Sequence, residues 1–138
     1  MININYIGDK PTQGSELATG YDLKVARKQV ILPNEVKFID TTTKLAVPED
    51  VICLGLPRSG ICHLGLILAN SVGLIDPDYR GNIKFAYWNR TNEPVTILKD
   101  ERLGQVIFIK ADKVNFINVD SLDETKRGDT GYGNSGRV

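Results

Sequence analysis

Short β-prone runs separated by turn residues dominate this chain, and no stretch has the 3.6-residue periodicity of a substantial helix. Side chains in residues 102–109 alternate between two faces, and Ile83, Phe85 and Tyr87 project to one side of another run. Residues 51–56 are apolar almost throughout, which predicts a strand covered on both faces. About a dozen such runs at this spacing are typical of sandwiches and distorted barrels, so we expect an all-β fold.

The size and charge of the chain narrow its class. Its 138 residues predict one domain, and seventeen Lys and Arg balance seventeen Asp and Glu. A net charge of zero argues against binding nucleic acid or an acidic membrane surface. The first twenty residues contain no apolar run, so we expect no membrane span and a cytoplasmic location. Cys53 and Cys62 match no zinc signature and His63 is the single histidine, which predicts free thiols and no protein-built metal cage.

The C-terminal end is rich in glycine and short polar residues from about residue 126 onward. Such a segment buries little and loses much backbone entropy on ordering, so we divide the chain into a β domain, 1–125, and a flexible tail, 126–138. A disordered terminus is the simpler interpretation of the tail. Its exposed amides, its polar side chains and one flat ring could also clamp a phosphorylated ligand; these side chains are Arg127, Tyr132, Asn134 and Ser135.

Two internal segments carry candidate chemistry. Residues 57–60, Pro-Arg-Ser-Gly, end an apolar run with groups that could neutralise an oxyanion, and they could equally form an ordinary turn. In residues 73–81, Asp76 or Asp78 could deprotonate a water, although Asp-Pro-Asp is also a common turn sequence. The chain has no P-loop and no dinucleotide-binding glycine motif, so any phosphates must be held in another way.

Five segments together resemble, in order, the five motifs of homotrimeric dUTPases; they are residues 18–23, 57–60, 70–81, 102–105 and 127–136. The resemblance implies a jelly-roll-like distorted β-barrel and three active sites built by three subunits. It implies hydrolysis of dUTP to dUMP and pyrophosphate, which keeps uracil out of DNA and supplies dUMP for thymidylate synthesis. The tail of one subunit would close over a pocket formed between two others.

The resemblance also implies a role for each matching residue. Asp76 would activate the water that attacks the α-phosphorus, and Tyr79 would pack against the sugar and exclude a 2′-hydroxyl. Tyr132 would cover the uracil. The uracil contacts would come from Asn70, Gly73, Leu74, Ile75 and Lys84, and the phosphate contacts from Arg58, Ser59, Gly60, Gln105, Arg127, Gly133, Asn134 and Ser135. Mg²⁺ would be chelated mainly by the phosphates without a direct protein ligand, and Asp22 would touch it through water or brace the phosphate site.

The chain departs from the family pattern at several positions. Asp100 and Gly104 stand where glycine and alanine are usual, and Thr130, Tyr132 and Asn134 replace a usual glycine, phenylalanine and serine. We expect local adjustment at the first two positions and changed phosphate contacts in the tail.

Two other functions fit parts of the sequence. A dCTP deaminase-like enzyme would share the fold, but that family places a glutamate shortly after the hairpin, where this chain has residues 84–86, Lys-Phe-Ala. A nucleotide-gated binding protein would use the mobile tail as a signal to a regulatory partner. The sequence identifies no such partner.

Overall fold

Ten strands and one short 3₁₀ helix account for the regular structure in a computed structural model that describes residues 1–134 and 136. The elements are β1 (Asn5–Ile7), β2 (Tyr21–Lys24), β3 (Gln29–Ile31), β4 (Val36–Ala46), β5 (Val51–Pro57), η1 (Ser59–Leu64), β6 (Leu66–Leu68), β7 (Gly73–Ile75), β8 (Asn82–Asn89), β9 (Val95–Ile97) and β10 (Arg102–Lys110). The all-β prediction is confirmed. No helix in the described part of the chain is long and apolar enough to cross a membrane.

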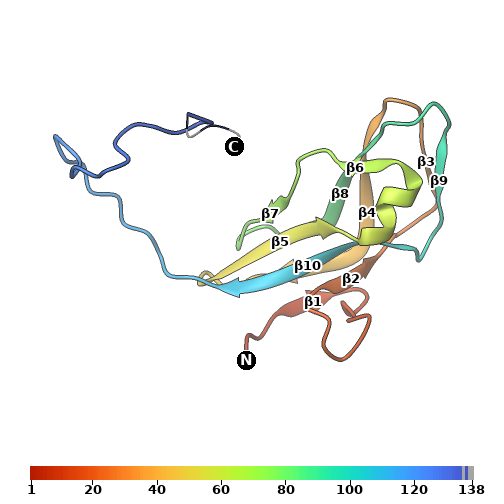
Figure 1. The fold of residues 1–138 in the computed structure, drawn as a ribbon. Coiled ribbons are helices and arrows are strands. Elements are labelled where there is room, and N and C mark those ends of the chain that lie inside the picture. The colour runs from red at the N-terminus through yellow and green to blue at the C-terminus, as the bar shows by residue number, and fades with distance from the viewer. Residues whose placement is uncertain (135, 137–138) are drawn as a thin grey trace.

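The strands form two four-stranded antiparallel sheets, with β3 and β9 as a separate pair (Figure 1). One sheet has the order β1-β4-β8-β6 and the other β2-β10-β5-β7. The two sheets pack as layers and do not close into one continuous barrel, which makes the fold jelly-roll-like. Neighbours in each sheet come from distant parts of the chain. The second and fourth family-like segments, residues 57–60 and 102–105, therefore meet where the end of β5 pairs with β10.

The core lies between the two sheets, where alternate side chains of each strand point inward. Ile39 of β4, Phe85 of β8 and Val106 of β10 are almost fully buried there. Tyr87 is also buried, and its hydroxyl donates a hydrogen bond to the carbonyl of Leu103. This bond joins β8 of one sheet to β10 of the other, and burial raises the pKa of the Tyr87 phenol far above its usual value.

The prediction that residues 51–56 are covered on both faces is wrong for this chain. Val51 and Cys53 point into the core, whereas Ile52 on the opposite face of β5 is 38% exposed. Leu54 and Leu56, on the same outer face, are only partly covered. The residues that the structure describes therefore cover this outer face only in part, and an apolar run by itself does not show whether a strand is covered by its own chain.

The chain after β10 leaves the body of the molecule. The N–H of Ala111 still donates to the carbonyl of Asp50 at 3.0 Å, and residues 112–130 are then exposed and contain no strand. Figure 1 shows residues 111–125, which we call the arm, extending away from both sheets. The arm exposes more than half of five apolar side chains, Val114, Phe116, Ile117, Val119 and Leu122. The boundary at residue 126 stays a prediction.

Candidate active site

Residues 70–81 connect β6 to β8 and contain β7, and we call this connection the hairpin. The chain leaves β6 through a turn in which Ser71 has φ of 64° and its N–H donates to the carbonyl of Leu68 at 3.0 Å. β7 then pairs antiparallel with β5, and a second turn follows in which the N–H of Tyr79 donates to the carbonyl of Asp76 at 3.1 Å. Ladder pairing on one side and a hydrogen-bonded turn at the end fix the position of this hairpin.

A pocket of about 250 Å³ lies against the hairpin, and we call it the base pocket. All seven residues that the sequence assigned to the base, the sugar and the attacking water line it: Asn70, Gly73, Leu74, Ile75, Asp76, Tyr79 and Lys84. The remaining walls are mainly apolar and come from Phe38, Gly55, Leu68, Ile83, Phe85 and Ala86. A small, mostly apolar cavity with a few polar groups is the usual form of a site for a small molecule.

Phe85 in the wall of this pocket explains one departure from the family pattern. A Cβ added to Gly104 would lie 2.3–2.5 Å from atoms of the Phe85 ring, so β10 can approach the ring only because this position has no side chain. Asp100, at the second departure, has a φ of 67°, the left-handed conformation that glycine usually provides. The local adjustment expected at both positions stays a prediction.

Asp76 lies at the mouth of the base pocket, and its side chain is exposed. The residues that the structure describes donate no hydrogen bond to its carboxylate, so both oxygens remain accessible to a water. The geometry therefore suits a general base, which needs reach and a free lone pair.

The phosphate residues of segments 1, 2 and 4 gather around a buried carboxylate. Asp22 on β2 is 5% exposed, and its Oδ1 lies 2.9 Å from Nε of Arg58. Its Oδ2 lies 3.4 Å from a guanidinium nitrogen of Arg102, and Arg58 also donates to the carbonyl of Arg102 at 3.2 Å. A buried carboxylate needs such compensation, and two arginines leave the cluster with a net positive charge. Arg58, Gly60 and Arg102 line a depression of about 360 Å³ beside it.

Gln105 and Ser59 complete this phosphate cluster. The Nε2 of Gln105 donates to the carbonyl of Pro57 at 3.0 Å. A Cβ on Gly20 would lie only 1.9 Å from Oε1 of Gln105, so the glycine of the first segment makes room for this side chain. Ser59 is exposed at the start of η1.

The predicted site residues thus fall into groups that one chain does not bring together. The base pocket and the phosphate depression are separate cavities, although Arg58 and Asp76 belong to one proposed site. Tail residues Arg127, Tyr132, Gly133 and Asn134 line neither cavity. Nε of Arg127 donates to the carbonyl of Thr130 in its own turn at 2.9 Å. Ser135 lies outside the described residues.

Sequence reasoning missed two residues of this region. Phe38 of β4 lines the base pocket because the β4–β8 register places it opposite Ala86, which lines the same pocket. The Phe38 side chain is 65% exposed. Arg102 joins Arg58 in holding Asp22. The signal for Arg102 was its place three residues before Gln105 in the fourth segment, but nothing local in the sequence marks Phe38.

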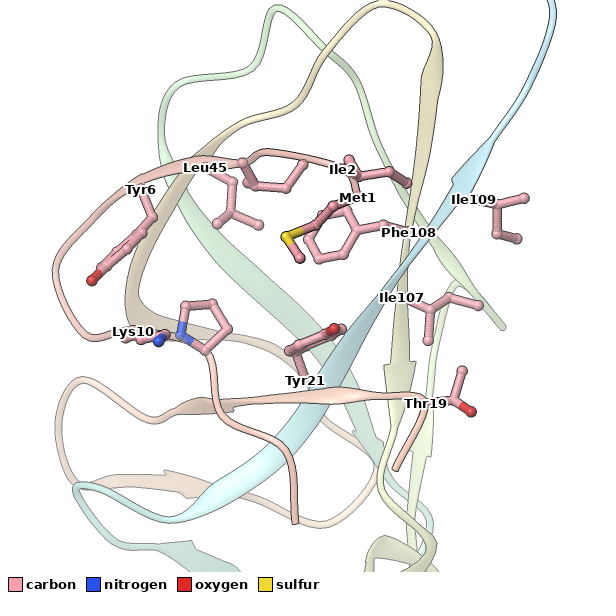
Figure 2. Close-up of a pocket in the computed structure, with 12 residues that line it drawn as sticks. Met1, Ile2, Tyr6, Lys10, Thr19, Tyr21, Leu45, Ile107, Phe108 and Ile109 are labelled. Atoms are coloured by element: carbon pink, nitrogen blue, oxygen red, sulfur yellow. The ribbon is translucent and has the colours of Figure 1, made fainter. Parts of the chain in front are cut away.

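A cavity larger than the base pocket and the phosphate depression lies elsewhere in the described part of the chain. An apolar groove of about 580 Å³ runs between the N-terminal segment and β10, and Met1, Tyr21 and Phe108 lie in its walls (Figure 2). It contains none of the predicted site residues. In residues 1–134 and 136, no group of three or more His, Cys, Asp and Glu side chains is arranged to hold a metal ion.

Comparisons with known proteins identify the family of this chain. The family model for dUTPase matches residues 8–136. A curated relative from Baumannia cicadellinicola, named deoxyuridine 5′-triphosphate nucleotidohydrolase, is 37% identical over 131 residues, covering 93% of this chain and 87% of the relative.

Two solved structures are similar in fold. A mutant dUTPase of Staphylococcus bacteriophage 80alpha with dUpNHpp has a TM-score of 0.87 at 21% identity, covering 97% of this chain and 98% of that one. A mutant dUTPase of phage phi11, described with a structural Mg(II) ion, has a TM-score of 0.80 at 18% identity, covering 88% and 99%. The family match spans all five segments, the base pocket and the phosphate cluster, and this chain therefore belongs to the dUTPase family.

Proposed function

We propose that this protein hydrolyses dUTP to dUMP and pyrophosphate, with Asp76 as the general base for a water that attacks the α-phosphorus. The observation that carries the proposal is the base pocket, where the seven residues assigned to base, sugar and water line one cavity. The named relative and the family match support the same reaction. By this activity the protein would limit uracil in DNA and supply dUMP, and we place it in the cytoplasm with that nucleotide pool.

The hairpin supports selection of the base and the sugar. Gly73, Leu74 and Ile75 bring main-chain donors and acceptors to the base pocket, where they can imitate a pairing partner for uracil. Cytosine would leave such groups unpaired, which costs far more than a missing apolar contact. The ring of Tyr79 would occupy the space that a 2′-hydroxyl needs.

We assign the triphosphate to Arg58, Ser59, Gly60 and Gln105, completed by the tail. Arg127 would contact the terminal phosphate, Gly133, Asn134 and Ser135 would donate further hydrogen bonds, and Tyr132 would cover the base. Mg²⁺ would travel with the phosphates and offset their charge. Asp22 suits the bracing role better than a contact to the ion, because both of its oxygens already face arginines.

A homotrimer is the assembly that we propose. The base pocket and the phosphate cluster are apart in one chain, so a complete site needs more than one copy. The apolar arm, the groove in Figure 2 and the outer face of β5 all expose apolar surface that self-association would cover. Sedimentation or light scattering should give three times the 15.3 kDa subunit mass, and the mass of one subunit would contradict this assembly.

The test of the function is a panel of nucleotides assayed for pyrophosphate with and without Mg²⁺. We expect rapid release from dUTP and negligible release from dCTP, dTTP and UTP. Ammonia released from dCTP would instead support a deaminase. Absence of pyrophosphate from dUTP under every condition would contradict the proposed function.

A further inference from the structure

Tyr79 lines two cavities, of which one is the base pocket. The other, which we call the far cavity, has a volume of about 310 Å³ and is lined by Ala26, Arg27, Asp40, Tyr79, Gly81, Asn82 and Lys84. Asp40 there lies 2.8 Å from Arg27 and 3.3 Å from Lys84, so the far cavity has charged walls. Tyr79 is also 41% exposed, so core packing alone does not fix the position of its ring.

Two backbone features hold the ring instead. The hydroxyl of Tyr79 donates to the carbonyl of Asn82 at 2.9 Å. The phenol also lies directly against Gly81, because a Cβ at that position would be 2.4 Å from the Tyr79 oxygen and 2.7 Å from Cζ. These distances are too short for any side chain larger than hydrogen, so the ring can occupy this position only while residue 81 is glycine.

Asn82 is itself fixed to the neighbouring strand. Its Nδ2 donates to the carbonyl of Thr41 at 2.6 Å. The β4–β8 register is irregular between Asp40 and Lys44, and this irregularity makes the Thr41 carbonyl available to a side chain. Thr41 is 1% exposed, and its hydroxyl donates to the carbonyl of Ile83 at 2.8 Å. The chain of contacts therefore runs from a buried irregularity in β4, through Asn82, to the hydroxyl of Tyr79.

We propose that Gly81 and Asn82 are positioning residues that set the preference of this enzyme for deoxyribose over ribose. The inference rests on the proposed function, in which the Tyr79 ring excludes a 2′-hydroxyl. Exclusion of one oxygen atom requires a wall that does not yield, and the far cavity offers the ring a place to move. Gly81 and the Asn82 carbonyl keep the ring on the base-pocket side.

The test compares Gly81→Ala with the wild type by the ratio of kcat/KM for dUTP to kcat/KM for UTP. Displacement of the ring should lower this ratio by about tenfold or more, the scale on which a pocket discriminates one small group. The matched control is Gly14→Ala, where the added Cβ would have no neighbour nearer than 4.0 Å, and its ratio should stay unchanged. A purely structural defect would lower both rates and leave the ratio as it was.

A second variant guards against a failure of Gly81→Ala to fold. Tyr79→Phe keeps the ring and removes its bond to Asn82, so the ratio should fall by a smaller factor while the melting temperature barely changes. Binding of dUMP against UMP by calorimetry gives the same comparison without turnover. If Gly81→Ala folds, an unchanged ratio of kcat/KM values in that variant would overturn this inference alone. If it does not fold, an unchanged ratio in Tyr79→Phe would do so. A wild type that neither hydrolyses dUTP nor prefers dUMP to UMP would overturn the proposed function as well.

Discussion

The base pocket and the tail carry residues of one proposed site, yet the protein holds them in different ways. Hairpin residues of the pocket pair with β5, and Phe85 of β8 supplies part of a buried wall. The hydrogen bonds of the described tail residues are local turns, such as those from Gly128 to Thr125 and from Asn134 to Gly131. Strand pairing within one chain therefore holds the pocket, whereas in the proposed function the tail would be ordered by the nucleotide that it binds.

This difference assigns base recognition and chemistry to the pocket and closure of the site to the tail. A pocket fixed by strand pairing can discriminate closely related bases, because its donors and acceptors do not move to suit the wrong one. In the proposed function, a tail whose described residues make only local hydrogen bonds would open for release and close over the bound nucleotide. Substitutions in the two regions should therefore change different measured quantities.

The largest effect is expected from Asp76→Asn, which removes the proposed general base and keeps the size of the side chain. We expect kcat to fall by roughly 10²–10⁴-fold. Binding of dUTP and the melting temperature should change little, because the carboxylate is exposed and holds no described hydrogen bond. Asp78→Asn is the matched control, since Asp78 is exposed two residues away and does not line the pocket. A wild-type kcat in Asp76→Asn would remove this residue from the mechanism.

Truncation after residue 125 should have the next largest effect. Loss of closure and of the Arg127 contact is expected to lower kcat/KM by about a hundredfold. The melting temperature should not change, because residues 126–130 and 132–134 are exposed and lie outside the core cluster. Arg127→Ala against Lys126→Ala narrows the test to one cation, and only the first should weaken binding of the triphosphate. Full activity of the truncated chain would show that the tail is dispensable.

The same contrast explains how much of the site the sequence could predict. The hairpin residues were predictable because they are contiguous, and local turn chemistry places them together. Phe38 was not, because it enters the pocket through the β4–β8 register, which pairs residues nearly fifty positions apart in the sequence. Alternation along a strand tells which residues share a face, and it does not tell which distant strand lies beside that face.

The fold shows a similar division. The strands and the absence of a substantial helix followed from hydrophobic periodicity. The exposure of the outer face of β5 did not, since Ile52 is exposed and Leu54 is only partly covered although both are apolar. The exposed arm was missed for a related reason, because Val114 and Phe116 look like core residues in the sequence. Apolar side chains predict burial, and the sequence alone does not say whether the same chain or, in the proposed trimer, another copy covers them.

A pair of variants tests that explanation. Ile39 is completely buried, so Ile39→Ala should lower the free energy of unfolding by about 2–5 kcal/mol. Phe116 is 92% exposed in the single chain, so Phe116→Ala should act only through assembly. Urea titrations should then show a loss in Phe116→Ala that depends on protein concentration, because association stabilises the folded state by mass action. A large loss that does not depend on concentration would mean that Phe116 packs within its own subunit.

The smallest effect is expected at the junction between body and arm, where Nζ of Lys113 lies 2.6 Å from a carboxylate oxygen of Glu49. The hydrogen bond from Lys113 holds the pKa of Glu49 below its ordinary 4.5, and the same bond raises the pKa of Lys113 above 10.5. The tether is therefore complete above the ordinary carboxyl pKa and is lost as pH falls through the lowered value of Glu49. At the alkaline end it is lost as pH rises through the raised value of Lys113.

Both groups are fully exposed, so the change in stability should be slight, and the motion of the arm is the better readout. NMR relaxation of residues 112–118 should show faster motion in acid, and Glu49→Gln should show that motion at neutral pH. Asp120→Asn, farther along the arm, should not, and identical relaxation in Glu49→Gln and wild type at neutral pH would mean that the backbone bond of Ala111 alone sets where the arm begins.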